Sequence, residues 1–302
     1  ARLRGVMPDW APLPVQYADY TLWQHELLGD ASDPNSRQNQ QLAWWREALR
    51  DLPEELPILT DRPRPAHPSY EGKQCLFTVD GEVYARLREF TQARQLSLFM
   101  VLQATLALLL RRLGAGVDIP LGTAIAGRTD DQLESLVGFF TNTLVLRTDV
   151  SGNPHFDELL EQVRNNTLQA FEHQDLPFET LVEALNPERS LARHPLFQIM
   201  LVLQNHARGE SLFNGLESRT AAQQLPVAKF DLTFNIDEHP DGLSGCVEYA
   251  TDLFDDATAT RIARYFCELL RAVSHDPHAH LNALMPFSEQ ERSQILNDWN
   301  AT

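Results

Sequence analysis

One segment restricts the fold more than any other. Residues 98–113 read LFMVLQATLALLLRRL, a mostly apolar helical stretch that Ser97 can cap and Gly114 ends. A helix with so few polar positions is buried against other elements of a domain. Its apolar part is shorter than the roughly 20 residues that cross a bilayer, and Gln103 interrupts it. We therefore expect a buried helix and no membrane span.

The rest of the chain mixes strand and helix patterns. Alternating or short apolar runs predict strands at 73–80, 117–127, 143–150, 196–205, 229–237 and 243–251. The sequence EHPDG between the last two predicts a hairpin turn, which also explains His239-Pro240-Asp241-Gly242. Further helices are predicted within 12–28 and at 40–52, 82–95, 156–172, 177–185 and 257–275. This mixture indicates an α/β domain, with a mixed β-sheet flanked by helices.

Local patterns add detail to this outline. One face of the 156–172 helix is predicted to bury Phe156, Leu159, Leu160, Val163 and Leu168. Residues 29–40 are polar and predict a loop. Five prolines in residues 53–68 exclude a helix or central strand there and predict an extended connector on the surface.

The composition excludes several functions. Lys and Arg number 25 against 42 Asp and Glu, a net charge of −17, which does not suit nucleic-acid phosphates or an anionic membrane. The N-terminus has no signal-peptide core. Cys75, Cys246 and Cys267 are far apart and odd in number, so we expect buried, reduced thiols in a cytoplasmic protein.

Most familiar catalytic patterns are absent from the sequence. It has no G-x-S-x-G, P-loop, G-x-G-x-x-G after a strand, or C-x-x-C motif. His275, His278 and His280 do not have the spacing of a metal site, and we expect an exposed turn and no metal there.

Residues 120–147 are harder to explain by packing alone. A strand ends in small residues around Gly127, where another backbone or a ligand can approach closely. Arg128 follows it, Gly138 turns the chain, and Asn142 and Thr143 begin the next strand. Polar groups at strand ends favour a pocket mouth, while a tight crossover turn explains them equally well.

Two more stretches carry similar signals. In residues 173–179 (HQDLPFE), Asp175 is expected to cap the following helix. In residues 193–198, Pro195 fixes the entry to a strand and Phe197 is expected in the core. Trp44 and Trp45 suit either ligand stacking or, as we favour, anchoring of the preceding loop.

Taken in order, these stretches resemble the condensation domains of nonribosomal peptide synthetases. The motifs cover nearly the whole chain, from YADY at 17–20 and GTAIAGR with GFFTNT at 122–143 to KFDL at 229–232, YATDLF at 249–254 and WNAT at 299–302. Their structural positions are Tyr17, Asp19, Gly127, Gly138, His173, Pro177, Phe178, Arg189, Pro195, Phe197 and Gln198. His194 occupies a position where the family has Asn.

The resemblance implies a chloramphenicol acetyltransferase-like lobe. In that family an acceptor amine attacks a donor thioester, both tethered to the phosphopantetheine of peptidyl carrier proteins, and no cofactor is bound directly. The resemblance further implies a substrate-tunnel wall, for which we select Arg128, Asn142, Thr143, Gln174 and Asp175.

The family's catalytic motif, His-His-x-x-x-Asp-Gly, is missing from this sequence. We therefore expect no catalytic residue here, with the catalytic His upstream in an N-terminal lobe, and no condensation by this chain alone. The expected divisions are 1–28 (end of that lobe and a crossover helix), 29–68 (connector), 69–287 (C-terminal lobe) and 288–302 (linker toward an adenylation domain). A non-catalytic module that docks a partner enzyme or carrier protein, and an epimerisation domain, are the alternatives.

Overall fold

The computed structural model describes residues 5, 7, 9–187, 190–204 and 225–287. Helix α4 (Leu98–Arg112) is buried at 12 of its 15 residues, as predicted. The hydroxyl of Ser97 accepts the backbone N–H of Met100 at 3.2 Å and so caps the helix. The buried Gln103 donates to Thr148 at 3.1 Å and accepts from Thr167 at 3.0 Å, so its amide is satisfied inside the core.

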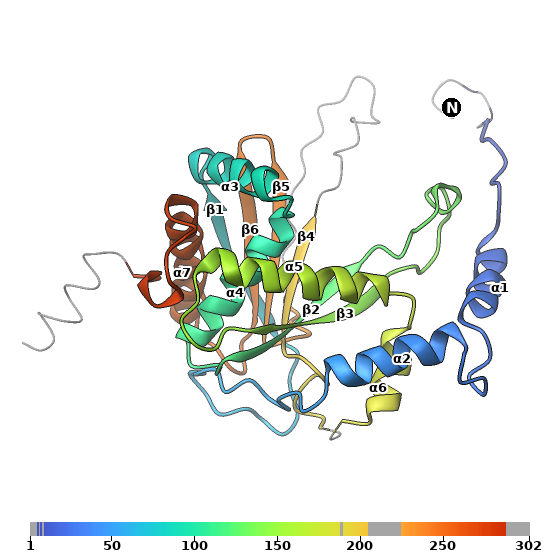
Figure 1. Cartoon of the computed structure of the whole chain (residues 1–302), viewed down its shortest axis with the longest axis horizontal. Coiled ribbons are helices and arrows are strands. Elements are labelled where there is room, and N and C mark those ends of the chain that lie inside the picture. Colours follow the sequence, from blue (N-terminus) through green and yellow to red (C-terminus); the bar gives the residue numbers. More distant parts are fainter. Residues whose placement is uncertain (1–4, 6, 8, 188–189, 205–224, 288–302) are drawn as a thin grey trace, which may run out of the picture.

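The expected mixed sheet is confirmed and has six strands, in the order β1-β6-β5-β4-β2-β3 (Figure 1). They are β1 (Gly72–Val79), β2 (Asp118–Ile125), β3 (Asn142–Asp149), β4 (Ile199–Gln204), β5 (Leu232–His239) and β6 (Gly242–Ala250). Strand β4 runs parallel to both β2 and β5, while the other neighbours are antiparallel.

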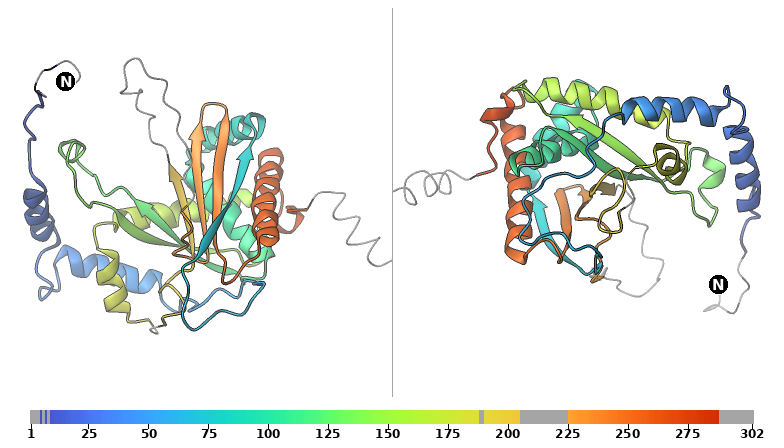
Figure 2. Two further views of the ribbon diagram at one scale, coloured as in Figure 1. Left: turned by 180° about the vertical axis from the view of Figure 1, so that it is seen from behind. Right: turned by 90° about the horizontal axis from the view of Figure 1, so that it is seen from below.

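Helices cover one face of this sheet. Together with α4, they are α3 (Gly81–Arg94), α5 (Phe156–Glu172) and α7 (Asp256–His275). Figure 2 (left) shows the opposite face without any described helix on it. In the described residues no single helix is long and apolar enough to span a membrane; α3 and α4 pass that test only together, across a bend of 111°.

Three helices lie beyond the β3 side of the sheet: α1 (Tyr17–Leu28), α2 (Arg37–Ala48) and α6 (Phe178–Leu185). Figure 1 shows α1 standing apart from the sheet, beside the loop that joins β2 to β3. The connector 53–68 contains neither helix nor strand, as its prolines predict.

Several local expectations are wrong. Leu168 is 45% exposed, and Thr167 and Ala170 are buried instead, because steps of four and three residues from Val163 keep to one face of the helix. Helix α2 begins inside the predicted loop, where the Ser36 hydroxyl accepts the N–H of Asn39. The three cysteines are free thiols, but they are half-buried rather than buried.

Candidate functional site

A cavity of about 190 Å³ lies where α1 meets the β2–β3 loop and the segment before α6. Three sequence motifs line it together, through Tyr17, Gly127, Asn142, Gln174, Asp175 and Pro177. These residues are up to 160 positions apart in sequence (177 − 17), so the fold gathers them at one place. This convergence makes the cavity the candidate functional site.

The first motif fixes α1 against the loop. Tyr17 donates its hydroxyl hydrogen to the carbonyl of Phe139 at 2.8 Å, and its ring meets Phe140 edge-on at 5.3 Å. A Cβ on Gly138 would lie 2.2 Å from the Tyr17 ring, so a larger residue would push the helix away. The Asp19 carboxylate accepts the N–H of Gln16 at 2.8 Å and holds the start of the helix.

The glycines of the second motif allow close contact with other parts of the same chain. Gly127 has φ +65°, and a Cβ there would lie 1.8 Å from the carbonyl oxygen of Phe140. A Cβ on Gly122 would meet the ring of the fully buried Phe197 at 2.1 Å. Of the two partners that the sequence left open, backbone or ligand, the close neighbours here are the chain's own backbone and rings.

Arg128 organises the loop that follows Gly127. Its guanidinium donates to the carbonyls of Leu133 and Leu136 and lies 4.1 Å from the ring centroid of Phe140. Neither Arg128 nor Thr143, which pairs with Ala124 between β2 and β3, lines this cavity. Their place in a substrate wall remains a prediction that this cavity does not support.

Asn142 joins two motifs through its carboxamide. Its Nδ2 donates to the carbonyls of Gln174 and Leu176 at 2.9 and 2.8 Å. Its Oδ1 accepts the N–H groups of Thr143 and Phe178 at 2.9 and 3.0 Å. Asn142 therefore caps α6, which corrects the expectation that Asp175 does so.

Asp175 is instead held by α2. Its Oδ2 accepts from the guanidinium of Arg37 and the amide of Gln41, each at 2.8 Å. Gln41 Oε1 in turn accepts the N–H of Leu176 at 2.8 Å. Pro177 occupies the N-terminal cap position of α6 and has no side-chain acceptor. The Asp175 carboxylate does not cap the helix but makes this ion pair.

The tryptophan pair also grips this segment. Trp45, 2% exposed, donates its indole N–H to the carbonyl of His173 at 2.9 Å. Trp44 stacks on the His173 ring at 4.3 Å with an interplanar angle of 8°. The tryptophans were expected to anchor the loop that precedes them; these two contacts hold the later 173–177 segment instead.

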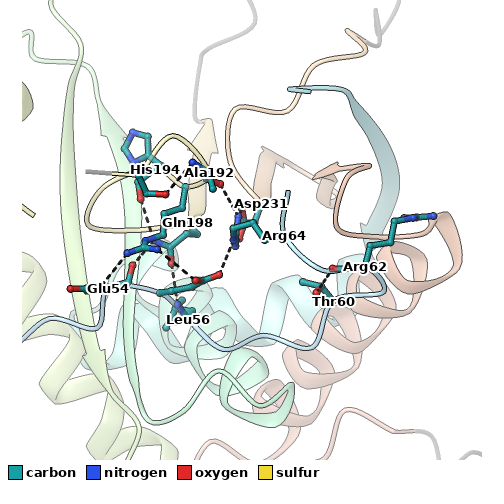
Figure 3. A network of polar contacts seen from close by, with 12 residues as sticks. Glu54, Leu56, Thr60, Arg62, Arg64, Ala192, His194, Gln198 and Asp231 are labelled. Carbon is teal, nitrogen blue, oxygen red and sulfur yellow. Dashed lines mark hydrogen bonds and ion pairs between the residues drawn. The ribbon is translucent and has the colours of Figure 1, made fainter. Parts of the chain in front are cut away.

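A further motif, at residues 193–198, attaches the connector to the sheet (Figure 3). Gln198, 2% exposed, accepts the N–H of Leu56 at 3.1 Å and donates to the carbonyls of Glu54 and His194. Arg64 makes a two-pronged ion pair with Asp231 of the KFDL motif. Arg189 and the 288–302 tail lie outside the described residues.

His194 lies next to this network. Its ring packs against those of Phe178, Phe197 and Phe230, with centroids 4.5–5.6 Å away. Burial among these rings lowers the pKa of His194. Pro195, which follows it, lines cavities on both sides of the 190–195 loop.

The sequence did not identify the α2 residues that bind Asp175. Arg37 and Gln41 lie in a polar stretch whose pattern gives no signal of Asp175, their partner 138 and 134 positions later. Tyr20 belongs to the first motif, yet only the structure shows that it lines the cavity at 8% exposure.

Among the described residues, no group of three or more His, Cys, Asp or Glu side chains is arranged to hold a metal ion. The three C-terminal histidines lie in and after the end of α7, where His278 contacts Asp157 at 2.8 Å.

Comparison with known proteins agrees with the motifs. A family model described as the condensation domain matches residues 9–296. A dimodular nonribosomal peptide synthase of Bacillus subtilis (strain 168) is 51% identical over all of this chain, which covers 13% of that protein. Malpinin synthetase of Mortierella alpina is 38% identical over 99% of the chain and 4% of its own length. The chain thus spans a small part of these relatives.

Solved structures show the same fold. The X-domain from teicoplanin biosynthesis superposes with a TM-score of 0.86 and 33% identity, over 94% of this chain and 65% of that one. The condensation domain of the Monacolin K polyketide synthase MokA, 21% identical, shares the fold with a TM-score of 0.74. The six-stranded mixed sheet with its flanking helices is the expected chloramphenicol acetyltransferase-like lobe. The chain belongs to the condensation-domain family of nonribosomal peptide synthetases.

Proposed function

We propose that this chain forms the C-terminal lobe of a condensation domain that makes a peptide bond. The observation that carries the proposal is that residues of the motifs at 17–20, 122–143 and 173–179 line one cavity together. In the reaction the acceptor amine nitrogen bonds to the donor carbonyl carbon. The carbon–sulfur bond breaks, and the proton released by the amine leaves with the pantetheine thiol.

The proposed role of this lobe is to position the reactants. A neutral amine is already a good nucleophile, so alignment with the thioester supplies much of the rate. The contacts of Asn142, Asp175 and Trp44 hold the cavity wall in one geometry, which suits this role. The catalytic histidine would come from a preceding lobe, and the carrier proteins and a following adenylation domain would be the partners. The free thiols fit the cytoplasm, which we propose as its location.

An activity assay tests this proposal. The 302-residue chain and a longer protein that also contains the residues encoded before it would each be mixed with donor- and acceptor-loaded carrier proteins. We expect dipeptidyl thioester, detected by mass spectrometry, from the longer protein only. Product formed by the 302-residue chain alone would refute the proposal.

The X-domain similarity favours one second candidate. That domain has also been solved in a complex with OxyB, at 32% identity to this chain. A chain so similar could serve as a docking module for a partner enzyme or carrier protein. A disrupted His-His-x-x-x-Asp-Gly motif in the preceding residues, with no product in the assay above, would select this candidate.

A further inference from the structure

Tyr20 is a buried donor without a partner in the cavity. The residue is 8% exposed, and no hydrogen bond to its hydroxyl occurs within the described part of the chain. The hydroxyl oxygen is not completely buried, so a ligand in the cavity can reach it. Burial raises the pKa of Tyr20, with smaller contributions from Tyr17 and then Asp175, so the hydroxyl stays protonated.

Two half-buried side chains that line the same cavity, Gln174 and Asp175, can also bind a ligand. The Gln174 side chain makes no hydrogen bond within the described residues; its contacts use the backbone carbonyl, which accepts from Asn142, and the backbone N–H, which donates to Phe171. The contacts of Asp175 with Arg37 and Gln41 all use Oδ2, which leaves Oδ1 as an acceptor. In contrast, Asn142 and Tyr17 are fully engaged with the protein.

The charges around the cavity limit what it can hold. Asp175 and Glu179 line it, and among its described lining residues there is no Lys or Arg. A phosphate would therefore meet no Lys or Arg among these residues, only the carboxylates of Glu179 and of Asp175, which Arg37 already pairs. The volume of 190 Å³ corresponds to about six waters at about 30 Å³ each, which is room for an amide-sized group.

We propose that Tyr20, Gln174 and Asp175 form a binding site for a secondary amide. The Tyr20 hydroxyl and the Gln174 amide donate to the carbonyl oxygen, and Asp175 Oδ1 accepts the amide N–H. A secondary amide presents both kinds of group at once, whereas an ammonium ion would leave the two donors unmatched. The amide can belong to a pantetheine arm or to a peptide backbone. Only the choice of pantetheine as a probe rests on the proposed function.

NMR titration of the ¹⁵N-labelled full chain tests the site. The probes are pantetheine, N-acetylglycine N-methylamide and n-butylammonium. We expect one or both amide probes to shift the resonances of residues 20, 174 and 175, and to bind more tightly than butylammonium. The amide probe with the lower Kd identifies the source of the amide.

Two variants make the test specific. Tyr20→Phe and Gln174→Met each remove one hydrogen-bonding group and should raise the Kd of the amide probe about five- to tenfold. Tyr70→Phe makes the same chemical change on an exposed residue outside this cavity and should leave the Kd within about twofold. If Tyr20→Phe does not fold, Gln174→Met decides.

The proposal is overturned if neither amide probe binds, if butylammonium binds more tightly, or if the variants bind as the wild type does. These results are independent of condensation activity. Binding with the expected variant effects but no product from the longer protein would reject the proposed function and leave the amide site standing.

Discussion

The Oδ1 atom of Asn142 accepts the backbone N–H of Phe178 at 3.0 Å, so the first residue of β3 caps helix α6, 36 positions later. The same carboxamide holds the carbonyls of Gln174 and Leu176. One side chain therefore fixes the position of the cavity wall relative to the sheet. In this family member, two sequence motifs meet as a single hydrogen-bonded joint.

Asn142→Ala should be strongly destabilising. It removes four hydrogen bonds and leaves partly buried backbone groups without partners, which predicts a loss of about 2–4 kcal/mol in the free energy of unfolding. Urea denaturation measures it. The matched control is Asn166→Ala, an exposed residue with one hydrogen bond of 3.4 Å, which should change stability by less than about 0.5 kcal/mol. A loss for Asn142→Ala as small as the one expected of the control, under about 0.5 kcal/mol, would show that the joint is unimportant.

The ion pair between Arg64 and Asp231 should contribute more to the free energy of unfolding than the exposed ion pair between Arg62 and Asp255. The side chains of this pair are 17% and 13% exposed, and the hydrogen bond to Asp231 raises the pKa of Arg64. Arg64→Met leaves the Asp231 carboxylate buried and unpaired, which predicts a loss of about 3 kcal/mol.

Arg62→Met is the control for this pair (Figure 3). Arg62 bonds Asp255 with side-chain exposures of 47% and 55%, so its loss should cost less than about 1 kcal/mol. Adding Asp231→Leu to Arg64→Met should recover part of the lost stability, because it removes the unpaired charge. A double variant as unstable as the sum of the single ones would argue against this pairing.

His194 should make the protein sensitive to acid. Its pKa in the folded state is lowered by burial, while the unfolded state keeps the ordinary value of about 6.5. The stability from the neutral ring is complete above pH 6.5 and declines as the pH falls from there through the folded-state pKa.

His194→Asn should remove that part of the pH dependence of unfolding. Denaturant titrations at several pH values from 7.5 to about 5 would measure it. The control His67→Asn changes an exposed residue and should leave the wild-type curve intact. A His194→Asn curve parallel to that of the wild type would exclude His194 as the source.

Arg128→Met should loosen the loop between β2 and β3. It removes donors to the carbonyls of Leu133 and Leu136 and the contact over Phe140, which together stabilise the loop by about 1–3 kcal/mol. Amide hydrogen exchange should become faster at residues 129–140, and much less so in β5. Arg46→Met, an exposed change on α2, should leave exchange in the loop as it is. Unchanged exchange in the Arg128 variant would contradict this role.

The elements of the fold were predictable because their signals are local. The apolar run around Leu106 predicts a buried helix, and the alternation along 229–237 and 243–251 predicts a hairpin, whatever the rest of the chain does. The hydrogen bonds and ion pairs of the site were not predictable in the same way. The ion pair of Arg37 with Asp175 and the cap that Asn142 gives to α6 depend on tertiary contacts between distant segments. A local rule therefore assigned Asp175 to the nearest helix start, where it does not act.

The most direct test is a crystal structure of the longer protein that includes the preceding residues. We predict that the cavity at Tyr20, Asn142 and Gln174 opens into one continuous cleft with the histidines of a His-His-x-x-x-Asp-Gly motif on the opposite wall. If the preceding residues seal the cavity, or place those histidines on another side of the molecule, this lobe does not form a wall of the condensation site.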